Sequence, residues 1–459
     1  MIKIEDVLAK IPEINEFLTV DEMDASTFAL AEKYPDLVSV DKVGESTKHH
    51  PIYRLKIGSG SKKALIFGCP HPNEPIGAMM IEHLSRIVCE NEDIREALDT
   101  EFHFIKCVDP DGLNLNKGWL KGPFSYYNYA SNFYRPSSTT QVEWTFPFKY
   151  KKYCWDTPLS ETQAVMKVID EVKPDVMFSL HNSSFGGVYW YVNKNNPEVV
   201  PYLGKAAARV DLPLNMGEPE VPFCQLYADA VYDLPQSGAM YDYYEENIKG
   251  VNPEDVMQGG GCSADYLDNV NKDAFVIICE MPYFYCPEGD DTSLCDDMSR
   301  REAILAGHKI QDELKEVSKK LILTLQKYAD PTSSCMLALN ERIADHPEHR
   351  QAQLALMEAN PEEYDVPCTK ASKFDNLIGT PWYSLLAFGM INTAAKETMA
   401  ASGDAEVKAV MEEVLKESEA FLTKKCNEID AQTPCNPIPV KKLVSVQMES
   451  ALLALGIKE

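Results

Sequence analysis

Three short apolar runs in this sequence each lead to a side chain that can bind a metal ion or accept a proton. Runs of this length, rich in β-branched and aromatic residues, predict buried strands. A carboxylate or imidazole at the end of a buried strand costs desolvation energy unless it has a partner or a chemical role. The sequence therefore favours a sheet whose strand ends meet at one site. The three pairs are residues 64–67 with His71, residues 176–180 with His181, and residues 275–279 with Glu280.

The first apolar run ends in a turn and is followed by a helical pattern. Gly68, Pro70 and Pro72 interrupt the strand, and Pro75 opens the amphipathic run 76–88. Proline is favoured in the first turn of a helix and cannot donate to a β-ladder. His71 and Glu74 are thus predicted on a strand-to-helix turn, where open α/β sheets place their ligands.

A histidine and a glutamate three residues apart can reach one metal ion from such a turn. Imidazole nitrogen and carboxylate oxygen both suit zinc. An isolated H-x-x-E pattern is weak evidence, because surface loops also contain it. His181 offers a third ligand and Glu280 offers a base, so the sequence predicts one Zn²⁺ per chain, held by His71, Glu74 and His181.

Further segments agree in order with a known family. Residues 109–112 read D-P-D-G, residues 160–164 read S-E-T-Q-A, and residues 260–266 read G-G-C-S-A-D-Y. Together with the H-x-x-E, the distant histidine and the strand-end glutamate, they resemble the zinc carboxypeptidase family, the M14-type metallocarboxypeptidases. The resemblance covers roughly residues 20–315. Residue 109 is Asp where the family has Asn.

The resemblance implies a fold and a set of substrate-binding residues. The implied fold is α/β, with a mixed twisted β-sheet flanked by helices. The implied binders of a substrate carboxylate lie in the long segment 112–158, where Asn132 and Arg135 match the Asn-Arg pair of the family. Lys117 or Lys121 is the alternative to a further arginine of the family.

The C-terminal part of the chain lies outside the resemblance. We expect a catalytic domain over residues 1–330 and an all-helical region over residues 331–459. The helical region contains apolar stretches such as residues 385–391, which a water-exposed tail would not carry. It is therefore predicted to pack onto the catalytic domain or onto a second copy of the chain, and to shape access to the site. A homo-oligomer through this region is one expected outcome.

Composition limits the classes of partner. The formal net charge is −27, which disfavours nucleic acids and anionic membranes as partners. No apolar run approaches the length of about 18 residues that indicates a membrane span. Thirteen cysteines without an export signal favour reduced thiols and a cytoplasmic location.

The predicted function is zinc-dependent hydrolysis of an amide bond, with release of a C-terminal amino acid from a peptide and with Glu280 as general base. Two alternatives stay open. An amidohydrolase of the aspartoacylase or succinylglutamate desuccinylase type would cleave a small N-acyl amino acid, and residues 71–74 are similar to the H-G-N-E of that branch. A catalytically inactive member would serve as a binding module, although the three ligands and the base are all present.

Overall fold

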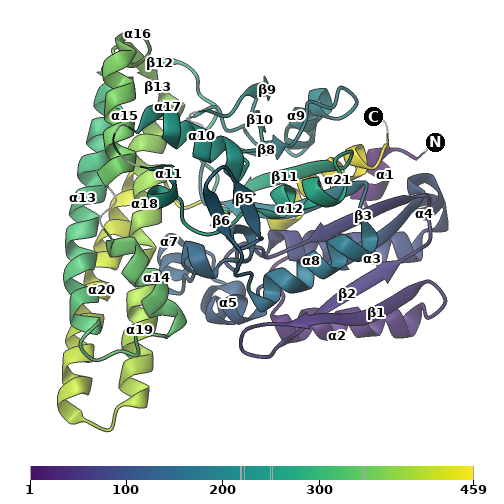
Figure 1. The fold of residues 1–459 in the computed structure, drawn as a ribbon, viewed down its shortest axis with the longest axis horizontal. Helices are drawn as coiled ribbons and strands as arrows, with labels where there is room; N and C mark the ends of the chain where they lie inside the picture. The colour runs from purple at the N-terminus through teal and green to yellow at the C-terminus, as the bar shows by residue number, and fades with distance from the viewer. Residues whose placement is uncertain are drawn as a thin grey trace.

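The computed structural model describes residues 2–217, 220–221, 223–248, 250, 252–344 and 347–457, and its centre is a nine-stranded mixed sheet. The strand order is β1-β2-β4-β3-β7-β11-β8-β10-β9 (Figure 1). The strands are β1 (Val38–Glu45), β2 (Pro51–Ile57), β3 (Lys62–Phe67), β4 (Thr100–Ile105), β7 (Val176–Ser183), β8 (Tyr189–Val192), β9 (Leu226–Ala228), β10 (Val231–Asp233) and β11 (Phe275–Pro282).

The central strands run in one direction. β4, β3, β7 and β11 form parallel pairs, and β2 and β8 flank them as antiparallel neighbours. Parallel strands end at the same edge of a sheet, so the segments that follow β3, β7 and β11 come together there. This confirms the predicted α/β class with a mixed sheet.

Alternating side chains of the central strands bury the two faces of the sheet. Along β3, Leu65 and Phe67 belong to one core, and Ala64 and Ile66 belong to the other. A period of two is what strand geometry imposes on a sheet covered on both sides. The helices on the Leu65 face are α8 (Ser160–Val172) and α12 (Ser263–Val270). The helices on the Ile66 face are α2 (Val20–Lys33), α3 (Ile76–Glu90), α9 (Val200–Arg209) and α21 (Val440–Ala454).

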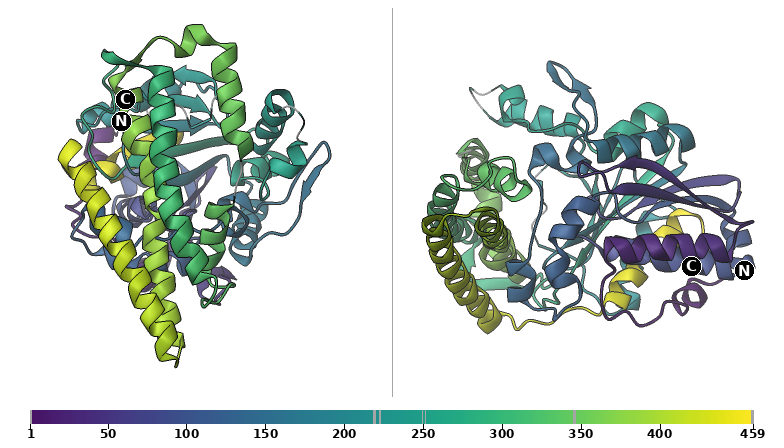
Figure 2. Two further views of the ribbon diagram at one scale, coloured as in Figure 1. Left: turned by 90° about the vertical axis from the view of Figure 1, so that its left-hand side faces the viewer. Right: turned by 90° about the horizontal axis from the view of Figure 1, so that it is seen from below.

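Helices from the second half of the chain, several of them long, stand together beside the sheet and the helices that cover it (Figures 1 and 2). The helices are α13 (Arg300–Leu325), α14 (Ser334–Ile343), α15 (Pro347–Ala359), α16 (Pro361–Tyr364), α17 (Lys370–Phe374), the π-helical turn η3 (Asp375–Gly379), α18 (Thr380–Leu385), α19 (Ala387–Ala401) and α20 (Ala405–Gln432). The helices α19 and α20 also pack against α7 (Tyr126–Ser131). This region therefore contacts the segment that joins β4 to β7. The strands β12 (Leu294–Ser299) and β13 (Pro367–Thr369) form a small sheet that contacts α13.

The last helix, α21, returns to the sheet. Residues 443–453 are all buried, which is the pattern of a helix covered on every side. Trp190 Nε1 on β8 donates to Ser450 Oγ at 3.0 Å, and Gln447 Nε2 donates to the carbonyl oxygen of His181 at 3.1 Å. The helix therefore closes the Ile66 face of the catalytic sandwich. The division of the chain at residue 330 stays a prediction. By sequence α21 belongs to the predicted helical region, yet it packs against the predicted catalytic domain.

Shorter elements complete the described chain. They are α1 (Ile4–Leu8), α4 (Glu92–Leu98), α5 (Pro110–Leu115), α6 (Lys117–Leu120), η1 (Ser138–Thr140), η2 (Val142–Trp144), β5 (Phe148–Tyr150), β6 (Tyr153–Trp155), α10 (Ser237–Asn247) and α11 (Pro253–Val256). None of the helices in the described ranges is both long enough and apolar enough to cross a membrane.

Candidate metal centre

A tight turn after β3 fixes the positions of His71 and Glu74. The turn is crowded, because a Cβ on Gly68 would come within 2.7 Å of the Ala78 nitrogen and of the Lys106 carbonyl oxygen. Within the turn, the Glu74 amide donates to the His71 carbonyl oxygen at 3.0 Å. The helix α3 starts directly afterwards at Ile76. Both side chains are almost completely buried, and the turn holds them on the same side.

The other two predicted residues come from neighbouring strands. His181 on β7 and Glu280 on β11 are register partners in a parallel pair. Partners in a sheet project to the same face, so the two side chains point to the same region. His181 is 5% exposed and Glu280 is 9% exposed. Because solvent hardly reaches these side chains, the groups that balance their charges must lie inside the site.

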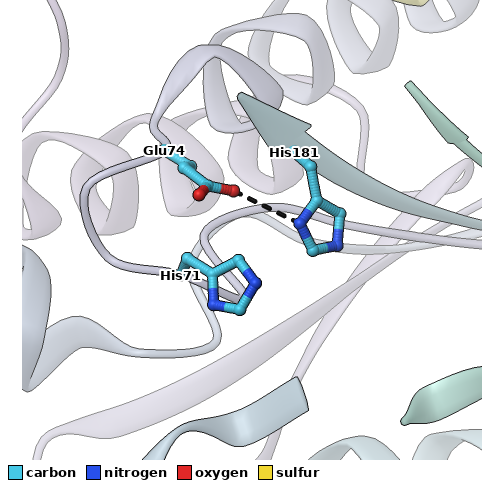
Figure 3. Close-up of side chains that lie close together, drawn as sticks. All are labelled: His71, Glu74 and His181. Atoms are coloured by element: carbon cyan, nitrogen blue, oxygen red, sulfur yellow. Dashed lines mark ion pairs between the residues drawn. The ribbon is translucent and has the colours of Figure 1, made fainter. Parts of the chain in front are cut away.

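The three proposed ligands meet in one small cluster. Their ligand atoms all lie within 4.8 Å of one another, and His181 Nδ1 is 3.3 Å from Glu74 Oε2 (Figure 3). The two imidazole rings lie edge to face with centroids 4.8 Å apart. Two histidines and one carboxylate are a typical donor set for a catalytic zinc site, which keeps a further position open.

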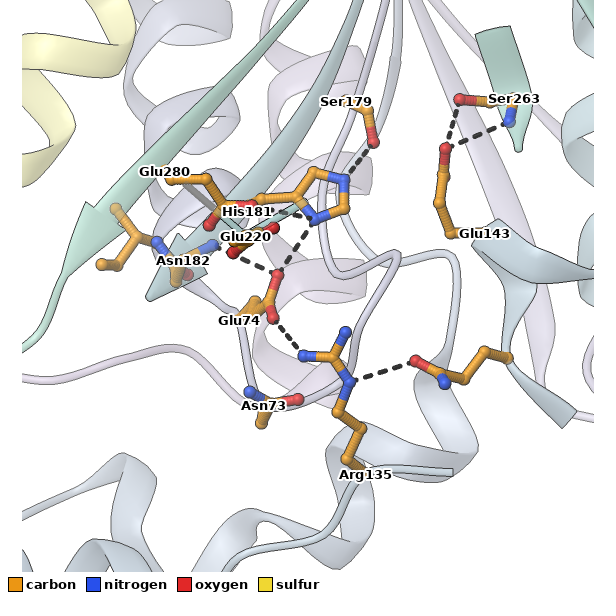
Figure 4. Close-up of polar contacts among 12 residues, drawn as sticks. Asn73, Glu74, Arg135, Glu143, Ser179, His181, Asn182, Glu220, Ser263 and Glu280 are labelled. Carbon is orange, nitrogen blue, oxygen red and sulfur yellow. Dashed lines mark hydrogen bonds and ion pairs between the residues drawn. The ribbon is translucent and has the colours of Figure 1, made fainter. Parts of the chain in front are cut away.

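Neighbouring groups orient the ligands. Ser179 Oγ lies 2.9 Å from His181 Nε2, so the opposite nitrogen, Nδ1, faces the cluster (Figure 4). The Asn182 amide donates to Glu74 Oε2 at 3.1 Å. His71 Nδ1 is a buried atom without a hydrogen-bond partner in the described part of the chain. A lone pair left unsatisfied in this position fits a metal ligand.

The charges around the cluster also fit a bound cation. Burial, then the positive charge of Arg135, lower the pKa of His71 well below its usual value, so this imidazole is neutral and can donate a lone pair. Burial alone would lower the pKa of His181, but Glu74, Glu280 and Glu143 raise it to about 9. The surplus of carboxylates thus draws a positive charge into the site. A divalent ion supplies that charge more directly than a proton.

Arg135 lies at the edge of this cluster. Its Nη1 donates to Glu74 Oε1 at 2.8 Å, and its Nε donates to Gln141 Oε1 at 3.1 Å (Figure 4). Asn132 is different, because its described hydrogen bonds go to Asn128 and Ser131 on α7. The structure therefore brings Arg135 to the metal centre but gives Asn132 a local role at the end of a helix.

A cavity of about 850 Å³ opens beside the cluster. Its lining includes Ser183, two residues after His181 on β7, and Tyr189, the register partner of Glu280 on β8. Its opposite wall comes from the helical region and includes Arg350 and Tyr383. The volume is within the usual range of small-ligand sites, about 300–1,000 Å³.

The family comparison agrees with this geometry. Residues 23–288, more than half of the chain, match the M14 peptidase family, described as zinc carboxypeptidase. The chain belongs to the zinc carboxypeptidase family. The match contains His71, Glu74, His181 and Glu280 and ends before α13, so it confirms the predicted family and leaves the long helices outside.

Solved structures similar to part of this chain include two carboxypeptidases. One is the carboxypeptidase A from Helicoverpa armigera, with 16% identity, coverage of 62% of this chain and 70% of that chain, and a TM-score of 0.40. The other is a metallo-carboxypeptidase from Burkholderia cenocepacia, with 18% identity, coverage of 58% and 60%, and a TM-score of 0.34. No curated protein matches the chain closely enough to count as a relative.

Several polar residues near the cluster are not apparent from the sequence of this family member. Glu220 accepts hydrogen bonds from the hydroxyl groups of Tyr189 and Tyr191, at 2.5 and 3.2 Å. Glu143 accepts from the Ser263 amide and hydroxyl at 3.0 and 2.7 Å. Both glutamates lie in irregular or short helical segments without a motif. The lysine alternative to a further arginine is not supported for Lys121, which pairs with Glu16 and Glu22.

Proposed function

We propose that the protein is a zinc-dependent amide hydrolase that releases a C-terminal amino acid from a short peptide, with His71, Glu74 and His181 as the metal ligands. The observation that carries the proposal is the approach of Glu280 to this cluster. Its Oε1 lies 3.8 Å from His181 Nδ1, the atom that faces the proposed metal position. A carboxylate placed beside a metal's open position is suited to activate water.

When bound, zinc would act as a Lewis acid that makes water nucleophilic near neutral pH. Burial, opposed by His181 and aided by Glu74, raises the pKa of Glu280 well above its usual value. A divalent cation in the site would oppose this shift and keep the carboxylate ionised, as a proton acceptor must be. In the proposed reaction Glu280 takes one proton from the attacking water. It then passes that proton to the amide nitrogen as the carbon–nitrogen bond breaks, so the products are an acid and an amine.

The proposal gives Arg135 a substrate-binding role beside the reacting carbonyl. Two of its nitrogens contact Glu74 and Gln141, which fixes the guanidinium plane. A guanidinium has five N–H donors in a rigid fork, so donors remain for a substrate oxygen. Asn132 carries no contact at the cluster, and the proposal does not use it.

Cleavage of a small N-acyl amino acid is the second candidate. It is favoured by the size of the cavity, about 850 Å³, and by the wall that the helical region adds to it. Both features suit a substrate of one or two residues better than a long peptide. The inactive binding module has no observation in its favour, because both the ligand set and Glu280 are in place.

One screen separates these candidates. The zinc-loaded protein is incubated with free-acid dipeptides, longer peptides and N-acyl amino acids, and amine release is measured. Release from peptides with a free C-terminus supports the carboxypeptidase. Release from N-acyl amino acids alone supports the amidohydrolase. No release from any member of the panel contradicts the hydrolase proposal.

A further inference from the structure

The helical region reaches the metal centre through α14. Glu341, near the end of this helix, accepts hydrogen bonds from the Ser138 amide and hydroxyl, at 2.8 and 2.6 Å. At the start of the helix, Ser334 is hydrogen-bonded to the hydroxyl of Tyr134. The helix therefore lies along the segment 134–138. That segment includes Arg135, which contacts the ligand Glu74.

This placement puts a second guanidinium, that of Arg342, within electrostatic reach of Arg135. Arg342 follows Glu341, and its Nη1 donates to the carbonyl oxygen of Tyr383 at 2.9 Å. Tyr383 itself lines the cavity beside the metal centre, together with Tyr189. Arg342 is thus held at the backbone of a residue that lines the cavity.

The guanidinium of Arg342 has no ion-pair partner in the part of the protein that the structure describes, although the negative charge of Glu341 acts on it. No carboxylate in the described ranges lies within ion-pair distance of its guanidinium. Burial, and after it the positive charge of Arg135, lower the pKa of Arg342 to about 10, so it remains a cation at neutral pH. A partly buried cation without an ion-pair partner is costly, and its cost falls when an anion binds.

Arg135 and Arg342 differ in how far their donors are already used. Arg135 is engaged by the metal ligand Glu74 and by Gln141. Arg342 has one described hydrogen bond, to a neutral carbonyl oxygen. A carboxylate is the anion whose shape matches a guanidinium fork, with two parallel N–H···O bonds. Of the two arginines, Arg342 on the helical region is therefore the more available for a substrate carboxylate.

We propose that Arg342 binds the carboxylate of the substrate, so that a residue outside the family match decides between free-acid and neutral substrates. The inference rests on the proposed hydrolase function for its substrate class. It makes the helical region one half of the substrate site, with Glu341 positioning the Arg135 segment and Arg342 recognising the charge.

The test compares the free acid and the C-terminal amide of the same N-acetylated dipeptides. Their binding is measured by calorimetry in the full-length Glu280→Gln protein, where turnover does not interfere, and KM and kcat are measured in the otherwise wild-type protein. Arg342→Met keeps much of the side-chain length without the charge. It should weaken acid binding at least about 10-fold, the lower range for a charge-assisted hydrogen bond, and leave amide binding unchanged. Arg342→Lys should be intermediate, since lysine offers a point charge without the fork.

Arg350→Met is the matched control. Arg350 lines the cavity beside the metal centre but pairs with Asp312 at 2.8 Å, so its removal should not discriminate acid from amide. Melting temperatures and zinc contents of all variants show whether the fold and metal site survive. Equal loss of acid and amide binding in Arg342→Met, no loss, or a parent protein that does not prefer the acid overturns the proposal. A preference for the acid that depends on Arg342, without any cleavage by the wild type, supports this inference while contradicting the hydrolase.

Discussion

Glu280 and His181 are register partners on the parallel strands β11 and β7, and their side chains meet with Oε1 and Nδ1 3.8 Å apart. The side-chain period of a strand is two, so a slip of one residue in this pairing would send Glu280 to the opposite face. The buried residues Ile277 and Cys279 on one side and Val276 and Ile278 on the other fix that register. The packing of the sheet therefore sets the distance between the proposed base and the metal site.

Replacement of a single ligand should remove the metal. We expect His71→Ala to lose stoichiometric zinc, because one carboxylate and one imidazole hold zinc much more weakly than three donors. Zinc is measured by elemental analysis after dialysis against a weak chelator. His308→Ala, on α13 and hydrogen-bonded to Gln353, is the control and should keep its zinc. Undiminished zinc in His71→Ala would contradict the ligand assignment.

Removal of the base should separate metal binding from turnover. Glu280→Gln keeps the side-chain shape but cannot accept the proton, so we expect unchanged zinc content and a fall in kcat of at least about 100-fold. The measurement uses the best substrate of the screen at saturating concentration. A kcat within a few-fold of wild type would mean that another group activates the water.

The buried face of α21 should contribute to the stability of the catalytic sandwich. Leu452 is completely buried against this core, and Leu452→Ala should lower the free energy of unfolding by about 2–5 kcal/mol, since it leaves a cavity. Leu323→Ala on α13, where the side chain is 46% exposed, should cost less than about 1 kcal/mol. Both free energies of unfolding are measured in urea by circular dichroism, with the strand and helix signals followed separately. Equal costs for the two variants would show that α21 is not part of the stabilising core.

Asp109 should make stability depend on pH. Burial, and then the charges of Glu161 and Asp111, raise the pKa of Asp109 to about 7. A raised carboxyl pKa means that the folded state holds the proton more tightly. This contribution is therefore complete below about pH 4 and is lost as pH rises through about 7.

Asp109→Asn removes this titration. Its Oδ1 can still accept the hydrogen bond that Asp109 receives from the Gly112 amide at 2.8 Å. We expect the variant to be more stable than wild type by about 1–3 kcal/mol at pH 8, and by much less at pH 5. Unfolding midpoints at the two pH values measure the difference. Asp93→Asn, an exposed substitution on α4, should change neither value, and an Asp109→Asn effect that does not vary with pH would contradict the assignment.

Local pattern in the sequence was enough to determine the strands, the turn and which side chains stand at their ends. The apolar runs before His71, His181 and Glu280 became β3, β7 and β11, because a strand of alternating or continuous apolar residues has few other ways to bury itself. The run after Pro75 became α3, two residues longer than the predicted 76–88. The order of the motifs then identified the family.

Tertiary structure alone decided what surrounds those residues. Asn132 and Arg135 are three residues apart, yet only Arg135 reaches the cluster, since Asn132 completes the end of α7. Arg342, Tyr383 and the buried helix α21 come from the region outside the family match. Their positions depend on helix packing between segments hundreds of residues apart. No periodicity or motif encodes such contacts, because they arise from the shape of the whole folded chain rather than from neighbours in sequence.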